Sequence, residues 1–514
     1  MSTPVCGVPA ADPRGACTVP PSRRSIGVID IGSNSLRLVV YEGSGRAPRV
    51  LFNEKAMCAL GRGMDTTGKL NPEGLVLARA NMERFVALAR CLSVERLDVL
   101  ATSAVRDALD GPDFVAEIEA RHGVRVNVIA GEEEGRLSAD GVLSGIPEAD
   151  GLMADLGGGS VELAPTRPAG PEDDVVSLPI GPLRLLGGTV IKAQAEIDRA
   201  IASVKWLARG RGKPFYAVGG AWRTLARMHM DQVGYPLHVI HEYTLPRQEA
   251  ENFLALIGRQ SGRSMGKIIG VSRKRLETLP IAAYILLRLL RTIKPSTLVF
   301  SAYGLREGHL FRQLPPEEQA LDPLLVGAEA VSLGMGRFGG VDKRLGRWLA
   351  PLFESSPPEE ARLRETAALL SDIGWNEHPD YRGEHAFLHC LRMPLPGLDH
   401  PGRVFIATAL HARYGGPAEA VAGPTVQSLL DPAAYGRARA LGLAIRLAYT
   451  VTGGVLSLLE RTRLRLDPGG GLVLSIRGDE ALFTGGTVAR RLDALGRQLG
   501  LPTAIRQKGG SRGK

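Results

Sequence analysis

The sequence predicts an α/β protein with two similar lobes, followed by a mostly helical region. Two stretches with the same pattern carry this prediction: Asp30-Ile-Gly-Ser-Asn-Ser35 and Asp155-Leu-Gly-Gly-Gly-Ser160. Each follows an apolar run and precedes a second β-rich run, which is typical of a strand, a tight turn and a strand. After about residue 320 the strand signals fade and the pattern becomes helical.

The first 24 residues are rich in Pro, Ala, Gly and Ser and contain no apolar core segment. We therefore expect a disordered leader rather than a secretory signal. Residues 25–145 should form the first lobe, with a helix at 73–92 that carries an apolar stripe and begins after Asn71-Pro72. Its strands are predicted at 26–30, 36–41, 97–101 and 124–130.

Residues 146–315 should form the second lobe. After the second turn it contains two more junctions of strand, glycine and helix, at 215–220 and 298–304. Such a junction commonly binds an anion at the start of its helix, but it is also an ordinary connection from a strand to a helix in any α/β protein. Residues 320–445 are predicted as a helical domain.

The end of the chain is predicted to differ from the helical domain. Residues 446–505 should form a small α+β region with short β runs at 462–466 and 471–476. Residues 506–514 are basic and rich in Gly, Ser and Lys, so we expect a disordered tail.

Composition limits the class of partner. The 514 residues carry a net charge of +9 and a pI of about 9.4, which suits polyanionic partners without identifying one. The five Cys include no CxxC pair, which argues against a disulfide framework or a zinc site. Reduced thiols are the better interpretation, so we expect a cytoplasmic protein. The most apolar helix, at 281–290, is too short to span a bilayer, and we expect no membrane partner.

Both turns have the residue types of a phosphate-binding loop. Gly and Ser let the backbone approach an anion and aim successive N–H groups at it. Arg37 follows the first turn, and its side chain faces either a cleft between the two lobes or solvent. Arg106 either binds phosphate oxygens or pairs with Asp107 or Asp110 on the surface. The predicted phosphate-binding residues are Gly32, Ser33, Asn34, Ser35, Arg37, Arg106, Gly157, Gly158, Gly159 and Ser160.

Carboxylates near the turns suggest hydrolysis and a divalent cation. Glu132-Glu133-Glu134 stands between a predicted strand and a helix expected from Gly135. These acids either stabilise the helix start or include a general base that takes a proton from water. Asp30, Asp155 and Glu162 are placed to hold Mg²⁺, although Glu162 could instead lie on an exposed strand face. The sequence contains no GxxxxGK[ST], GxSxG or HExxH motif.

Five motifs in this order resemble the exopolyphosphatase and guanosine pentaphosphate phosphohydrolase family over roughly residues 25–312. The resemblance implies two RNase H-like lobes of the actin, Hsp70 and sugar-kinase superfold and Mg²⁺-dependent removal of a terminal phosphate by water. It also implies that Glu134 is the catalytic base and Asp155 a second essential carboxylate. The motifs are Asp30–Arg37, Thr102–Arg106, Gly131–Ser138, Asp155–Glu162 and Gly304–Gly308.

The helical region resembles the HD-like domain of longer family members. Working HD hydrolases need a His-Asp pair as metal ligands, and here the pair is Ser371-Asp372. We therefore expect a structural or dimerising domain without catalysis of its own, and a homodimer. Trp222 stands where the family often has a small hydroxyl residue, so its indole either narrows a nucleoside pocket or points into the lobe core.

These observations predict an exopolyphosphatase that removes the terminal phosphate of inorganic polyphosphate. The alternative is hydrolysis of guanosine pentaphosphate to the tetraphosphate, which needs the same chemistry and is not separated by sequence. A kinase of the same superfold and a nucleotide-sensing or nucleic-acid-binding protein are more distant alternatives. We expect no nucleic acid as partner, because the acids proposed for catalysis are intact.

Overall fold

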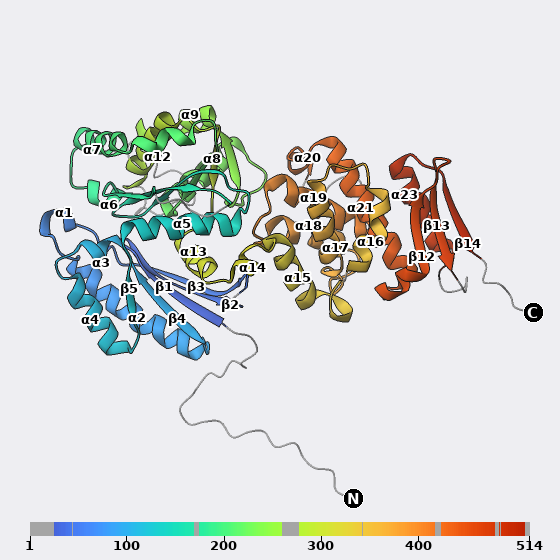
Figure 1. Cartoon of the computed structure of the whole chain (residues 1–514), viewed down its shortest axis with the longest axis horizontal. Helices are drawn as coiled ribbons and strands as arrows, with labels where there is room; N and C mark the ends of the chain where they lie inside the picture. The colour runs from blue at the N-terminus through green and yellow to red at the C-terminus, as the bar shows by residue number, and fades with distance from the viewer. Residues whose placement is uncertain are drawn as a thin grey trace, which may run out of the picture. The chain divides into compact units, whose positions relative to one another are not determined.

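The computed structural model describes residues 25–43, 45–168, 174–259, 277–341, 343–416, 423–477, 483 and 485–508 (Figure 1). The predicted leader at 1–24 and the last six residues lie outside the described part. The chain divides into two compact units. Unit 1 comprises Met1–Leu143, Glu148–Leu225 and Thr244–Gln319, and unit 2 comprises Ser144–Pro147, Ala226–Tyr243 and Ala320–Lys514.

The first lobe is a five-stranded sheet in the order β3-β2-β1-β4-β5. Strands β1 to β3 are antiparallel, and β1, β4 and β5 are parallel. Apolar residues of α2 (Pro72–Cys91) and α4 (Gly111–His122) share one core with the sheet. A second core joins the sheet to α5 (Gly131–Gly145) and α13 (Leu305–Arg312). The strands are β1 (Ser25–Ile31), β2 (Ser35–Glu42), β3 (Arg49–Met57), β4 (Arg96–Ala101) and β5 (Val126–Val128), and the short helices are α1 (Met64–Thr67) and α3 (Ser103–Asp107).

The second lobe is a six-stranded sheet in the order β10-β11-β9-β6-β7-β8. The predicted apolar helix is α12 (Leu279–Ile293), and most of its side chains are buried. The strands are β6 (Gly151–Leu156), β7 (Val161–Thr166), β8 (Val176–Leu178), β9 (Phe215–Val218), β10 (Tyr243–Pro246) and β11 (Thr297–Phe300). The other helices are α6 (Pro182–Leu185), α7 (Val190–Ser203), α8 (Gly220–Val233), α9 (Arg247–Arg259) and α14 (Pro316–Gln319).

The two lobes repeat one hairpin. In β1–β2, Asp30 pairs with Arg37; in β6–β7, Asp155 pairs with Glu162 at the equivalent position. The same backbone bond closes both turns, from Gly32 N to Ser35 O at 3.1 Å and from Gly157 N to Ser160 O at 3.0 Å. The predicted repeat of two α/β lobes, each with a strand–turn–strand device, is therefore confirmed.

Unit 2 is mainly helical and ends in a small sheet. Its core contains apolar residues of α19 (His400–Arg413), α21 (Pro432–Thr452) and α23 (Gly486–Leu499). The sheet has the order β12-β13-β14, with β12 (Thr462–Leu466) antiparallel and β14 (Thr503–Lys508) parallel to the central β13 (Leu472–Arg477). The other helices are α15 (Pro323–Met335), α16 (Lys343–Leu349), α17 (Glu360–Leu369), α18 (Arg382–Arg392) and α20 (Gly423–Gln427).

Several elements differ from the sequence-based expectation. Strand β3 was not predicted, because most of its residues are exposed at the edge of the sheet. The expected strand at 124–130 is limited to β5, and the acidic run 132–134 forms the first turn of α5 instead of preceding the helix. Strand β14 includes residues 506–508, which were predicted to belong to the disordered tail at 506–514. Their pairing with β13 explains this difference. Among the helices described, none is long and apolar enough to cross a membrane.

Candidate active site

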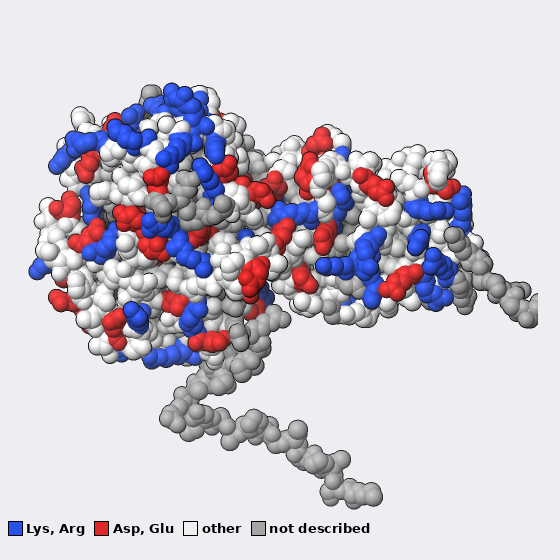
Figure 2. All heavy atoms as spheres, in the orientation of Figure 1, with Lys and Arg blue, Asp and Glu red and all other residues white. Residues whose placement is uncertain are grey.

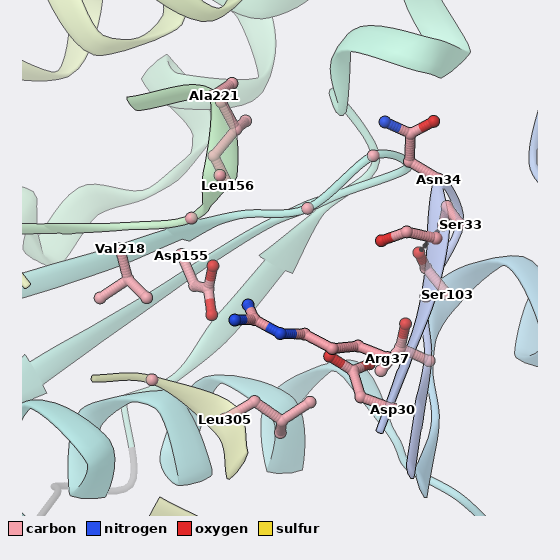
Figure 3. Close-up of a pocket in the computed structure, with 18 of the residues that line it drawn as sticks. Asp30, Ser33, Asn34, Arg37, Ser103, Asp155, Leu156, Val218, Ala221 and Leu305 are labelled. Carbon is pink, nitrogen blue, oxygen red and sulfur yellow. Dashed lines mark hydrogen bonds between the residues drawn. The ribbon is translucent and has the colours of Figure 1, made fainter. Parts of the chain in front are cut away.

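A cleft of about 180 Å³ within unit 1 contains most of the predicted site residues (Figure 3). Both turns contribute to its wall, as do the start of α5 and the two strand–glycine–helix junctions noted in the sequence. Figure 3 shows Arg37 reaching across the cleft toward Asp155. The predicted residues that line it are Asp30, Gly32, Ser33, Asn34, Ser35, Arg37, Glu134, Asp155, Gly157 and Gly158.

The two turns lie against each other, and glycine is needed for this approach. A Cβ atom on Gly158 would lie 3.1 Å from Cβ of Ser33, and one on Gly159 would lie 2.9 Å from Oγ of Ser103. The hydroxyls of Ser33 and Ser103 are themselves hydrogen-bonded at 2.8 Å. The sequence Gly-Gly-Gly-Ser thus lets the two lobes bring their turns together, with hydroxyl groups and backbone beside the cleft.

Glycines also explain how α5 presents Glu134. A Cβ on Gly131 would lie 2.4 Å from Cβ of Ser177, and one on Gly135 would lie 3.4 Å from Cβ of Glu162. The two glycines flanking the acidic run therefore allow the first turn of α5 to lie directly on β7 and β8. This contact places Glu134 close to Glu162.

Two buried carboxylates, of Glu134 and Glu162, meet the half-buried carboxylate of Asp155 at this place. Burial raises the pKa of Glu134 well above its usual value, and the charges of Glu162 and Asp155 raise it further. Burial likewise raises the pKa of Glu162 to about 7 and raises that of Asp155. Hydrogen bonds oppose the shift: Ser177 donates to Glu162 at 2.8 Å and Ser138 to Asp155 at 2.6 Å. Burial, more than repulsion among the carboxylates, therefore disfavours the ionised form of all three groups.

This cluster suits a hard divalent cation that also binds substrate. Oε2 of Glu162 is buried and accepts no hydrogen bond of normal geometry from any described residue. The hydroxyl of Ser160 is nevertheless close enough to lower the pKa of Glu162 and so to favour its ionised form. Among the described residues, no three His, Cys, Asp or Glu side chains form a ready metal cage. Mg²⁺ typically uses one or two carboxylates together with substrate phosphates, so the residues present fit that ion.

Three arginines, Arg37, Arg223 and Arg306, line the same cleft. Arg37 donates to Asn53 at 2.8 Å, and Arg306 donates to Asp30 at 2.7 Å. Burial, and then the neighbouring arginines, lower the pKa of Arg37 and bring that of Arg223 to about 10. Burial also acts to lower the pKa of Arg306, but Glu307 and Asp30 outweigh it and raise that pKa. An anion in the cleft would relieve the repulsion among these guanidinium groups.

Four predicted site residues do not line the cleft. Arg106 pairs with Asp107 at 3.1 Å, as one of the two interpretations anticipated, and its Nη1 lies 3.4 Å from Oε2 of Glu134. Ser160 and Glu162 are buried behind the second turn, so Glu162 does not lie on an exposed strand face. Gly159 lies at the neighbouring contact with Ser103.

Sequence reasoning missed Arg223 and Arg306 as site residues. Each lies in the first turn of a helix that follows one of the predicted junctions, at Gly219-Gly220 and at Gly304. A search for basic residues just after each junction would have found both. Trp222 takes the second of its two predicted positions: it is fully buried, and its Nε1 donates to the carbonyl of Ala282 at 2.9 Å. Its indole therefore does not narrow the cleft.

In unit 2 the carboxylate of Asp372 is held by an arginine. Nε and Nη2 of Arg337 donate to its two oxygens at 2.9 and 2.8 Å, and the backbone N of Arg337 donates at 3.0 Å. The guanidinium also lies over the ring of Trp375, 3.5 Å from its centroid. Ser371 bonds to the carbonyl of Ala368 and to the hydroxyl of Tyr449. Both members of the Ser-Asp pair are thus engaged by protein groups.

Replacing Arg337 with Met should lower the free energy of unfolding of unit 2 by about 3 kcal/mol. The change leaves the buried carboxylate of Asp372 with only the longer, 3.9 Å ion-pair contact to Arg413, and breaking a buried pair typically costs about 3–5 kcal/mol. Chemical unfolding monitored by tryptophan fluorescence would measure the change. Arg382→Met is a matched control, because Arg382 also lies on Trp375 but forms no ion pair with Asp372. Equal losses in the two variants would contradict this account.

Two α/β lobes with a glycine-rich turn from each, a buried carboxylate cluster and three arginines define an enzyme of phosphoryl transfer. The chain belongs to the Ppx/GppA phosphatase family, which it matches over residues 18–317. Residues 344–505 match the family described as exopolyphosphatase, C-terminal. These matches confirm the family predicted from the motifs.

Individual relatives are distant. The chain is 26% identical over 330 residues to exopolyphosphatase 1 of Mycobacterium tuberculosis, covering 61% of this chain and 95% of the relative. It is 26% identical over 441 residues to retrograde regulation protein 2 of Saccharomyces cerevisiae, covering 77% and 73%. A crystal structure of an exopolyphosphatase from Cytophaga hutchinsonii superposes with a TM-score of 0.52 at 24% identity, covering 56% of this chain and 97% of that one, which supports the fold.

Proposed function

We propose that the protein is an exopolyphosphatase that hydrolyses the terminal phosphate of inorganic polyphosphate and releases orthophosphate. The observation that carries this proposal is the position of Glu134: a buried carboxylate with a raised pKa, opening on a cleft formed by two phosphate-type turns and three arginines. The curated relatives named exopolyphosphatase support polyphosphate as the substrate.

In this proposal the chain's own groups bind and orient the terminal phosphate. Backbone N–H groups of both turns and the guanidinium groups of Arg37, Arg223 and Arg306 bind its oxygens. Glu134 accepts a proton from water as the water attacks phosphorus, and the shortened chain leaves as the P–O–P bond breaks. Positioning and electrostatics supply most of the acceleration in such reactions. Arg106 acts as a positioning residue that holds Glu134, instead of gripping phosphate as the sequence suggested.

The proposed cofactor is Mg²⁺, which would offset charge on the phosphoryl oxygens. Asp155, with Glu162 or Asp30, would hold it. Asp30 is already engaged by Arg306, so Asp155 and Glu162 are the better candidates among the residues predicted to bind metal. The raised pKa values of these two carboxyls supply a test that does not depend on turnover.

Without metal, the melting temperature should fall between about pH 5 and pH 8. A carboxyl whose pKa is raised from about 4.3 in the unfolded chain to about 7 in the folded one binds its proton more tightly when folded, so its stabilising effect is lost as the pH rises through this range. Mg²⁺ should therefore raise the melting temperature more at pH 8 than at pH 5. Glu162→Gln should reduce this difference; an equal Mg²⁺ effect at both pH values would contradict the site.

The manner of hydrolysis tests the proposal. An enzyme that works from the chain end releases orthophosphate from the first turnovers, and gel electrophoresis of long polyphosphate would show no short fragments early in the reaction. Early fragments without orthophosphate would overturn the proposal. Guanosine pentaphosphate remains the second candidate, because the buried position of Trp222 leaves the cleft wall beside Ala221 open to a nucleoside.

For unit 2 we infer an HD-like helical domain that has lost its metal centre and supports a homodimer. The bidentate contact from Arg337 to Asp372 supports the loss, since it engages the oxygens that a metal would need. Elemental analysis should find no stoichiometric transition metal, and light scattering should give twice the chain mass. Metal that Asp372→Asn removes, or a monomer at micromolar concentration, would contradict this inference.

A further inference from the structure

A carboxylate outside the cleft is shared by two arginines, one from each lobe of unit 1. Asp107 ends α3 of the first lobe, and its Oδ1 accepts from Nε of Arg106 at 3.1 Å. Its Oδ2 accepts at 2.9 Å from Nη2 of Arg184, which belongs to α6 of the second lobe. Asp107 therefore links α3 to α6 through one oxygen while it holds Arg106 through the other.

Both ends of this link are tied to the phosphate-type turns. In α6, the backbone N of Leu183 donates to the carbonyl of Gly158 at 2.9 Å, so the helix that carries Arg184 is bonded to the second turn. In α3, the hydroxyl of Ser103 is hydrogen-bonded to that of Ser33 in the first turn. The ion pair between the lobes thus spans the contact between the two turns.

The same carboxylate reaches the proposed base through Arg106. Nη1 of Arg106 donates to the carbonyl of Ile129 at 3.0 Å and lies 3.4 Å from Oε2 of Glu134. Because Asp107 holds Nε and Ile129 holds Nη1, the guanidinium plane of Arg106 is fixed at two points. The direction of Arg106 toward Glu134 therefore depends on Asp107 being in place.

A surface ion pair without any role in catalysis is the alternative. Acidic and basic side chains are interspersed over the face of unit 1 drawn in Figure 2. The side chains of Arg184 and Asp107 are 31% and 33% exposed, and a partly exposed pair contributes little to stability. This pair differs from an ordinary one because its carboxylate also holds an arginine that contacts the proposed base.

We propose that Asp107 and Arg184 are positioning residues for hydrolysis, and that their ion pair across the lobes holds Arg106 against Glu134. This inference rests on the proposed function, since it assumes that Glu134 is the base. Neither positioning residue lines the cleft, so their loss should not weaken binding of the terminal phosphate. It should lower turnover, because a base acts only within hydrogen-bond reach of the water that it deprotonates.

Arg184→Met should lower kcat on polyphosphate about tenfold and leave KM within about twofold of the wild-type value. The change removes only the distant partner of Asp107. Arg184→Lys should recover most of the turnover, because its ammonium group still supplies a positive donor. The matched control is Arg79→Met, which breaks an ion pair with Glu117 between α2 and α4 at similar exposed fractions of 39% and 35%. This control should keep the kcat and KM of the wild type.

A double-mutant cycle separates positioning from a purely structural role. If Arg184 acts through Arg106, adding Arg184→Met to Arg106→Met should cause no further loss of kcat, whereas independent effects would multiply. This non-additivity, together with an unchanged melting temperature of Arg184→Met, would support the inference. Equal fold losses in both backgrounds, a change in KM alone, or wild-type kcat in Arg184→Met would overturn it. Orthophosphate release by the wild-type protein reports separately on the proposed function.

Discussion

Glu134→Gln should lower kcat on polyphosphate by about two to four orders of magnitude, since a general base typically contributes that much. Gln keeps the size of the side chain and can still accept a hydrogen bond from Arg106. It cannot take a proton from water. Binding of polyphosphate should persist, because the turns and the arginines of the cleft are unchanged. Steady-state phosphate release together with a binding isotherm would separate the two effects.

The adjacent glutamate supplies the matched control. Glu133 bonds to Arg312, and Arg136 lies within ion-pair distance, so its side chain is directed away from the cleft that Glu134 lines. Glu133→Gln should therefore retain turnover within a few-fold of wild type. If Glu133→Gln abolished turnover while Glu134→Gln kept it, the assignment of the base would be wrong by one residue.

Asp155→Asn should raise the Mg²⁺ concentration needed for half-maximal activity by at least about a hundredfold. Partners outside the coordination shell already contribute about 10–100-fold to metal affinity or activity, and loss of a charged ligand should cost no less. Ser138 can still donate to the remaining oxygen of Asn, so the local fold should be retained. A Mg²⁺ titration of initial rates would measure the shift.

Asp150→Asn is the corresponding control, because Asp150 lies just before β6 and pairs with Lys213 at the surface. Its Mg²⁺ titration should match that of the wild type. A normal titration curve for Asp155→Asn, with activity lowered equally at every Mg²⁺ concentration, would instead assign Asp155 to positioning water or phosphate.

The sequence was most informative where local chemistry determines backbone shape. The paired turns needed small residues for their close contact, and that need is visible as Gly and Ser after an apolar strand. The two glycines flanking the acidic run are visible too, and the structure explains them by the contact of α5 with Ser177 and Glu162. For this reason the two lobes and ten of the residues that line the cleft could be predicted.

Tertiary placement accounts for what sequence reasoning missed. Arg223 and Arg306 line the cleft because the two helices that follow the junctions begin beside it, and their position just after each junction is the only local signal for this role. Arg106 was assigned to phosphate because it follows a strand, but its side chain is drawn to Asp107 and Glu134. Strand β14 is polar and exposed, so only its pairing with β13 identifies it.

The most direct test of the central claim is orthophosphate release by the purified wild-type protein, measured side by side on polyphosphate and guanosine pentaphosphate with Mg²⁺. The proposed function predicts Mg²⁺-dependent release from polyphosphate with the larger kcat/KM. Turnover of guanosine pentaphosphate with no release from polyphosphate of any length would contradict it.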